Sequence, residues 1–128
     1  MTVDETVGDV LVLEDNAIFS MCLVGTLENL GYKTTLAVST EEAREAVQGY
    51  EFYAAILDNE CPGQRHGPAL RDEGIRYAYE LRESHPEMKV AMHTTTRFDQ
   101  QDREYIESKG ITLIEKGADE AVFRQFLE

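Results

Sequence analysis

The chain has 128 residues, of which 42% are hydrophobic and 29% are charged, and its formal net charge at pH 7 is −13. This length suits one domain with its own core. The negative charge excludes the basic surface that nucleic acids or anionic membranes require, and no apolar stretch approaches the ~20 residues that span a bilayer.

Short apolar runs, which predict buried strands, alternate with polar segments of helical period along the chain. In chain order, the predicted elements are a strand at Val10–Leu13, a helix at 16–30, a strand at Tyr32–Val38, a helix beginning at Ser39, a strand at Tyr53–Leu57, a loop at 59–73, a helix at Gly74–Ser84, a strand at Val90–His93, a helix at 97–109, a strand at Ile111–Ile114 and a helix at 118–128. Asn16 and Ser39 are the predicted helix caps, Ser39 with Glu42 three residues later. Gly31 ends the first helix.

Five repeats of strand and helix predict an α/β fold, with one doubly wound parallel sheet and helices on both faces. Right-handed crossovers leave few topologies for such a sheet. Its binding site is expected beyond the carboxyl ends of the strands. The candidates for that site are the residues that follow the strands: Glu14 and Asp15, Asp58, Thr94, and Lys116.

The chemistry of these candidates suits a phosphoryl group. Three carboxylates at one sheet edge repel one another unless a cation neutralises them, and Mg²⁺ prefers such oxygen ligands. Lys116 adds a positive charge and Thr94 adds a hydroxyl donor. Charge clamps on the transferring oxygens are most of what phosphoryl transfer requires, so one carboxylate is expected to act as the nucleophile.

Four segments in this order resemble the receiver domains of bacterial two-component response regulators. They are VLVLEDN with the acidic pair, AAILDNECP with the phospho-accepting aspartate, VAMHTT with the hydroxyl, and LIEK with the lysine. The resemblance covers essentially the whole chain. It implies a flavodoxin-like, five-stranded parallel sheet with strand order 2-1-3-4-5.

The resemblance also implies a role for each matching residue. Asp58 is the implied phospho-acceptor, and Thr94 and Lys116 are expected to bind phosphoryl oxygens after activation. Mg²⁺ is the implied cofactor. Its implied ligands are Glu14 through water, Asp15, Asp58 and the backbone carbonyl of Glu60.

Several positions that tune switching in this family carry unusual residues here. Thr95 stands where the family usually has a small residue, and Thr96 and Glu60 flank the place of the hydrolytic water. An acid at Glu60 either hinders metal binding or orients that water. Leu113 replaces an aromatic that often moves with the hydroxyl, and Gly117 replaces a proline after the lysine.

The predicted loop at 59–73 is longer than the family norm. It carries Arg65, His66 and Arg71 close to the expected site. Two interpretations stay open, a solvated surface loop and a lid that tunes phosphate lifetime or partner access.

The first predicted helix lacks a polar side. Its segment AIFSMCLVGTL contains no charge, although a surface helix normally has a charged face. Ile18, Met21, Cys22 and Gly25 lie off the expected buried stripe. They either dock the phosphodonor or pack against the last helix.

The predicted function is a stand-alone receiver over residues 1–128, with no output domain and no enzymatic activity beyond its own phosphorylation and dephosphorylation. The expected partners are a histidine kinase or a histidine phosphotransfer protein and a downstream protein that binds residues 97–128, with no nucleic acid and no membrane. It acts as an output switch or a phosphate sink. Two cysteines without a framework pattern favour the cytoplasm. The alternatives are an unphosphorylated binding module with this fold and, less favoured, a haloacid-dehalogenase-like phosphatase.

Overall fold

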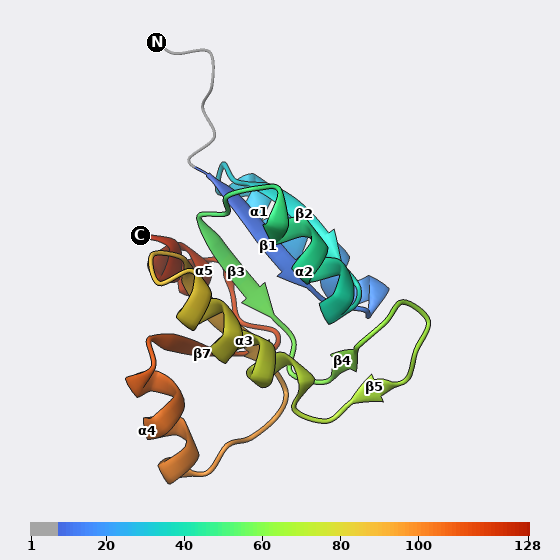
Figure 1. Ribbon diagram of the computed structural model, residues 1–128. Coiled ribbons are helices and arrows are strands. Elements are labelled where there is room, and N and C mark those ends of the chain that lie inside the picture. The colour runs from blue at the N-terminus through green and yellow to red at the C-terminus, as the bar shows by residue number, and fades with distance from the viewer. Residues whose placement is uncertain (1–7) are drawn as a thin grey trace.

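The structure, a computed structural model, describes residues 8–128, so the first seven residues of the predicted domain lie outside it. In chain order its elements are β1 Asp9–Leu13, α1 Ala17–Asn29, β2 Lys33–Ala37, α2 Thr40–Gln48, β3 Ala54–Leu57, β4 Cys61–Pro62, β5 Ala69–Leu70, α3 Glu73–Ser84, β6 Lys89–Thr94, α4 Gln100–Ser108, β7 Ile111–Glu115 and α5 Glu120–Leu127. Five strands form one parallel sheet in the order β2-β1-β3-β6-β7, which is 2-1-3-4-5 when only its own strands are counted. Figure 1 labels β2, β1, β3 and β7 of this sheet. The predicted fold class and strand order are confirmed. Within residues 8–128 no helix combines the length and the apolar character that a membrane crossing requires.

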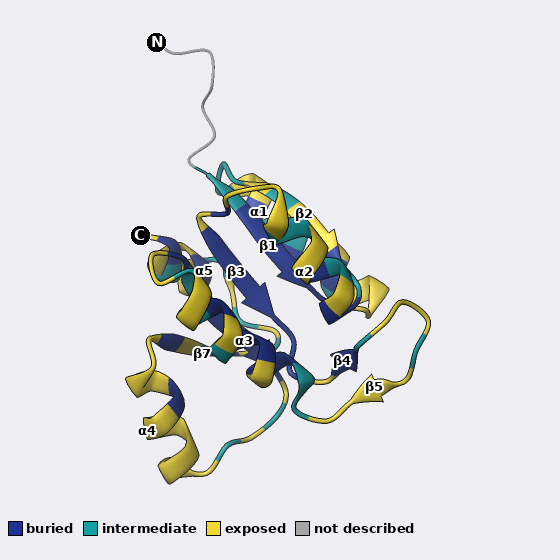
Figure 2. Cartoon of the chain, in the orientation of Figure 1, coloured by how far each residue is buried: buried dark blue, intermediate teal, exposed yellow. Residues whose placement is uncertain are grey.

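The helices cover both faces of the sheet. In β1, Leu11 and Leu13 pack in the core beneath α2, α3 and α4, whereas Val10 and Val12 pack in the core beneath α1 and α5. The central strands β1 and β3 are therefore buried on both faces (Figure 2). This burial explains why both strands appear in the sequence as continuous apolar runs rather than as alternating patterns.

The predicted helix signals are correct. The Asn16 side chain accepts hydrogen bonds from two backbone N–H groups in the first turn of α1. Ser39 Oγ accepts one from the backbone N–H of Glu42 at 3.2 Å at the start of α2. Gly31 follows α1 with a φ of 97°, in the left-handed region that favours glycine.

Two helices begin later than predicted. The helix α4 begins at Gln100 because Asp99, rather than residue 97, caps it by accepting a hydrogen bond from the backbone N–H three residues on. The helix α5 begins at Glu120 for the same reason, with Asp119 as its cap. Both corrections follow the preference for an extended, oxygen-bearing residue just before the first turn.

The predicted loop at 59–73 contains a short hairpin. The strands β4 and β5 pair antiparallel, and the hairpin projects beyond the sheet edge beside α2 (Figure 1). The Gly63 carbonyl accepts a hydrogen bond from Glu41 N at 3.0 Å, and Arg65 forms an exposed ion pair with Glu42 at 2.5 Å. The hairpin is thus attached to the N-terminus of α2, which corrects the prediction of a loop without structure.

Candidate functional site

Three carboxylates meet at the carboxyl-terminal edge of the sheet. Glu14 and Asp15 follow β1, and Asp58 follows β3. Glu14 and Asp58 are buried, with 2% and 7% of their surface exposed, whereas Asp15 is exposed. One carboxylate oxygen of each residue lies within 4.8 Å of one carboxylate oxygen of each of the other two. The fold therefore brings together the three acids that the strand ends singled out.

Lys116 enters this cluster from the end of β7. Its Nζ lies 2.8 Å from Glu14 Oε1 and 3.2 Å from Asp58 Oδ2, and only 9% of its side chain is exposed. The ammonium group also lies 4.3 Å from the ring centroid of Phe19, a contact that was not predicted from the sequence. One cation against three carboxylates leaves two negative charges uncompensated when all three acids are ionised.

The Glu14 carboxylate is held by the start of α1. Its Oε2 accepts a hydrogen bond from the backbone N–H of Asn16 at 3.1 Å. Its Oε1 is buried and lies 2.8 Å from Lys116 Nζ. Both carboxylate oxygens of Glu14 therefore have a polar partner.

The site changes the proton affinity of two of its members. Burial and the charge of Glu14 raise the pKa of Asp58 to about 6, and Lys116 opposes that rise. For Lys116, burial lowers the pKa, but its hydrogen bonds and charge interactions with the two acids outweigh burial and raise it. A divalent cation among the carboxylates would favour the ionised form of Asp58, which is the nucleophilic form.

Thr94 ends β6 and is buried. Its hydroxyl donates a hydrogen bond to Thr96 Oγ1 at 3.1 Å and accepts one from Thr96 N at 3.0 Å. Thr95, between them, is exposed. Across residues 8–128 no hydrogen bond joins Thr94 to Asp58, so the hydroxyl is directed at its neighbour rather than at the acceptor aspartate.

Asn59 is a site residue that sequence reasoning missed. Its fully buried side chain donates to Thr96 Oγ1 at 3.2 Å and to Asp72 Oδ1 at 3.0 Å, and it accepts from Ile75 N at 3.0 Å. It therefore caps α3 from another segment, because Asp72 makes no side-chain cap of its own. These partners lie 13 to 37 residues away along the chain, so no local sequence pattern predicts them.

Gly74 brings the first turn of α3 onto the acceptor loop. Its backbone N–H donates to the Asn59 carbonyl at 2.8 Å. A Cβ at this position would lie 1.8 Å from the carbonyl oxygen of Asp58. Only glycine permits so close an approach, and the position of Asp58 therefore depends on it.

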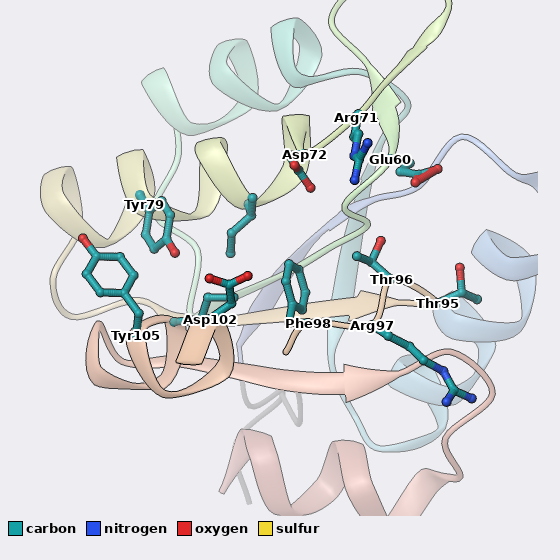
Figure 3. Close-up of a pocket in the computed structure, with 12 residues that line it drawn as sticks. Glu60, Arg71, Asp72, Tyr79, Thr95, Thr96, Arg97, Phe98, Asp102 and Tyr105 are labelled. Carbon is teal, nitrogen blue, oxygen red and sulfur yellow. The ribbon is translucent and has the colours of Figure 1, made fainter. Parts of the chain in front are cut away.

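The side chain of Glu60 is exposed and lines a pocket of about 480 Å³ beside the site. Figure 3 shows this pocket between α3 and α4, with Glu60 and Arg71 at one end and Tyr79 and Tyr105 at the other. The role of the Glu60 backbone carbonyl as a metal ligand stays a prediction.

Two further predicted positions lie near Lys116. Leu113 is half-buried and lines a second pocket, of about 400 Å³, together with Thr94 and Lys116. Gly117 has a φ of 90°, and no atom lies within 4 Å of the place of a Cβ. Its glycine is thus required by the backbone conformation and not by crowding.

The uncharged helix α1 presents an apolar surface. Ile18 and Met21 are 72% and 73% exposed, Cys22 is exposed, and a Cβ at Gly25 would meet nothing within 4 Å. These four residues, the α1 patch, are therefore exposed rather than buried against α5. The docking role of the patch stays a prediction.

The family model described as the response regulator receiver domain matches residues 10–128. No curated protein matches the sequence.

Solved structures share the fold at low sequence identity. The BeF3-activated N-terminal receiver domain of Klebsiella pneumoniae RstA has a TM-score of 0.75 at 16% identity, with 94% of this chain and 98% of that chain covered. A response regulator protein from Burkholderia pseudomallei, described with a phosphorylated aspartic acid and a calcium ion, has a TM-score of 0.76 at 19% identity, with 94% and 66% covered. NtrX from Brucella abortus has a TM-score of 0.72 at 21% identity, and the chain spans about a quarter of its length, with 94% and 26% covered.

Proposed function

This chain belongs to the response regulator receiver domain family, and on that premise we propose that Asp58 accepts a phosphoryl group from a phosphohistidine of a histidine kinase or a histidine phosphotransfer protein. The observation that carries the proposal is the cluster of Glu14, Asp15 and Asp58 with Lys116 bridging the two buried acids. The family model spans residues 10–128, so the proposal concerns one receiver domain.

The cluster suits Mg²⁺ as a cofactor. All three ligands are carboxylate oxygens, which Mg²⁺ prefers, and Lys116 supplies one positive charge against three acids. Oxygens that share one Mg²⁺ lie up to about 4 Å apart, so atoms within 4.8 Å need to move little. Asp15 and Asp58 would bind directly, Glu14 through water, and Glu60 through its backbone carbonyl. When bound, the ion neutralises charge on the nucleophile and on the incoming phosphoryl oxygens.

The residues around Asp58 divide the work of transfer. A carboxylate oxygen of Asp58 attacks phosphorus while the P–N bond to the donor histidine breaks, and the electron pair remains on the imidazole nitrogen, which takes up a proton. Lys116 Nζ, 3.2 Å from Asp58 Oδ2, pairs with one phosphoryl oxygen. The Thr94 hydroxyl donates a hydrogen bond to a second phosphoryl oxygen.

Four neighbouring positions tune the switch: Thr95, Thr96, Leu113 and Gly117. Thr95 is exposed beside Thr94, where its bulk limits the approach of a partner or of water. Leu113 lacks the aromatic ring whose movement the family often couples to the hydroxyl. The readout therefore passes through the backbone and α4 rather than through a ring.

Two surfaces serve partners in this proposal. The α1 patch lies beside the acidic cluster and docks the phosphodonor, because its apolar side chains stay exposed. Residues 97–128 change their binding to a downstream protein on phosphorylation, unless the chain serves only as a phosphate sink. Two free cysteines, Cys22 and Cys61, support a place in the reducing cytoplasm.

Labelling with a small phosphodonor tests the proposal. With acetyl phosphate and Mg²⁺, the chain should gain one hydroxylamine-sensitive phosphoryl group, read by mass spectrometry, and a chelator should prevent it. Asp58→Asn should abolish labelling. Asp119→Asn, a matched change at an exposed helix cap, should not.

The alternatives give different results in the same assay. Labelling that persists at a similar rate in Asp58→Asn would refute the assignment of the nucleophile. Binding of Mg²⁺ without labelling by any donor would favour an unphosphorylated binding module. Steady turnover of a phosphate ester would favour a phosphatase.

A further inference from the structure

The Thr94 hydroxyl has a single proton, and the geometry around Oγ1 directs it to a neighbouring hydroxyl. It is donated to Thr96 Oγ1 at 3.1 Å. A hydroxyl donates one hydrogen bond at a time. To bind a phosphoryl oxygen, Thr94 must therefore release Thr96.

Thr96 is itself held in place. Its Oγ1 accepts a second hydrogen bond, from Asn59 Nδ2 at 3.2 Å. Figure 3 shows Thr96 facing the segment that carries Asp72 and Arg71, whereas Arg97 points away from that segment. Thr96 is thus fixed by an anchor and cannot simply follow the hydroxyl of Thr94.

The anchor is rigid because Asn59 is bound on several sides. Its side chain is fully buried, and it joins Asp72 and the backbone N–H of Ile75 as well as Thr96. Its own carbonyl accepts from Gly74 N at 2.8 Å. Asn59 directly follows Asp58, so the anchor and the acceptor share one turn.

We propose that Thr96 and Asn59 are positioning residues that retain the Thr94 hydroxyl in the unphosphorylated chain and thereby lower the affinity of the site for a phosphoryl group. This inference rests on the proposed role of Asp58. Asn59 holds Thr96, and Thr96 holds the proton that the phosphoryl group needs. Thr96 N–H also donates to Thr94 Oγ1, and that bond does not compete, because it leaves the Thr94 proton free.

A purely structural role for Thr96 predicts the opposite effect of its removal. If Thr96 only supports the site, its loss weakens binding of a phosphoryl mimic. If it retains the hydroxyl, its loss tightens binding, by about three- to tenfold for one neutral hydrogen bond. The sign of the change therefore separates the two roles.

Beryllofluoride with Mg²⁺ is the probe, because it mimics the phosphoryl group and forms no covalent product that turnover would remove. Calorimetric titration of the metal-loaded chain measures its dissociation constant. Thr96→Val and Thr96→Ala should both bind it about three- to tenfold more tightly than the wild type. Thr96→Ser keeps the acceptor oxygen and should bind as the wild type does. Thr112→Val, a matched change at an exposed threonine of β7, should also leave the affinity unchanged.

A double-variant cycle tests the anchor. Asn59→Asp keeps an oxygen to cap Ile75 N but cannot donate to Thr96. The charge added by Asn59→Asp should change the affinity for beryllofluoride equally whether residue 96 is threonine or valine. Loss of the hydrogen bond from Asn59 to Thr96 should change that affinity only when residue 96 is threonine. The change in affinity on Asn59→Asp should therefore be more favourable in the wild type than in Thr96→Val. Equal changes in both would show that Asn59 does not act through Thr96.

The outcomes separate this inference from the proposed function. If the wild type neither binds beryllofluoride nor becomes labelled at Asp58, the proposed function fails and this inference fails with it. If the wild type binds and is labelled, but Thr96→Val and Thr96→Ala bind equally well or more weakly, only this inference is overturned.

Discussion

At the scale of the residue, Gly74 shows how closely the acceptor loop is packed. A Cβ there would lie 1.8 Å from the backbone oxygen of Asp58 and 2.7 Å from the Cα of Asn59. Both are backbone atoms, which cannot rotate aside as a flexible side chain does. Relief requires that α3 or the acceptor loop moves, and the capping bonds of Asn59 resist such a movement.

Gly74→Ala should therefore destabilise the chain by about 3 kcal/mol or more and weaken beryllofluoride binding, since relief displaces Asp58. Chemical unfolding and calorimetry measure the two effects. Gly25→Ala is the matched control for stability, because an added Cβ meets nothing within 4 Å in the middle of α1. That variant should gain roughly 0.5–1 kcal/mol. Equal stabilities of Gly74→Ala and the wild type would contradict the close contact.

Which residues meet at the site was predictable only where topology decides it. The carboxyl ends of parallel strands share one edge, so the meeting of Glu14, Asp58 and Lys116 followed from their positions in the chain. The anchoring role of Asn59 did not follow, because its partners come from α3 and from the segment after β6. An asparagine after a strand is common in turns, and the sequence alone gives no sign of which N–H it caps.

At the scale of the element, α1 combines two roles on different faces. Leu23 and Leu27 are buried against the sheet, whereas Ile18 and Met21 stay exposed. An apolar surface next to the acidic cluster is the feature on which the proposed docking of the phosphodonor depends.

Met21→Lys should slow phosphoryl transfer from a histidine kinase that labels the wild type by about tenfold, since it places a charge in the centre of an apolar contact. Labelling by acetyl phosphate should stay unchanged, because that donor needs no docking surface. Radiolabel transfer under single-turnover conditions measures both rates. Gln48→Lys adds the same charge on the exposed side of α2 and serves as the control. Equal losses with both donors would indicate damage to the site itself.

Element boundaries were less predictable than the elements themselves. The strands of the main sheet were recognisable from their apolar runs, whereas the strands β4 and β5 have two residues each and no periodicity to detect. Arg65 also could not be placed from the sequence. Its ion pair with Glu42 directs it towards α2 rather than towards Asp58.

At the scale of the whole molecule, two buried groups give stability opposite dependences on pH. The pKa of Asp58 is raised to about 6 by burial and by Glu14, so this group makes the metal-free fold more stable as the pH falls from 7 towards 4. The pKa of His93 is lowered to about 4 by burial and by Lys116. The contribution of neutral, buried His93 to the stability of the fold is complete above pH 6.5 and is lost as the pH falls towards 4. The two contributions oppose each other in the wild type.

Asp58→Asn should separate them. Without metal at pH 7.5, the variant should be more stable than the wild type by on the order of 1–3 kcal/mol, because it removes a buried charge that repels Glu14. The difference should shrink as the pH falls to 4, where Asp58 is protonated in the folded wild type, and should vanish only below the ordinary pKa of 3.8. The variant alone should lose stability between pH 6.5 and 4 as His93 becomes charged. Urea unfolding in a chelator across this range measures the free energies, and a variant less stable at pH 7.5 would refute the repulsion.

The β4–β5 hairpin leaves and rejoins the domain at nearly the same point. Cys61 pairs with Leu70, Pro62 pairs with Ala69, and Gly74 N binds the Asn59 carbonyl across the base. Because these bonds fix both ends, residues added to the turn at 64–68 would lengthen a closed loop, at only about 0.6 kcal/mol for each doubling of length. This turn can therefore change in length at little cost while Asp58 stays in place. For protein engineering, it is a position at which a foreign peptide can be displayed beside the phosphorylation site.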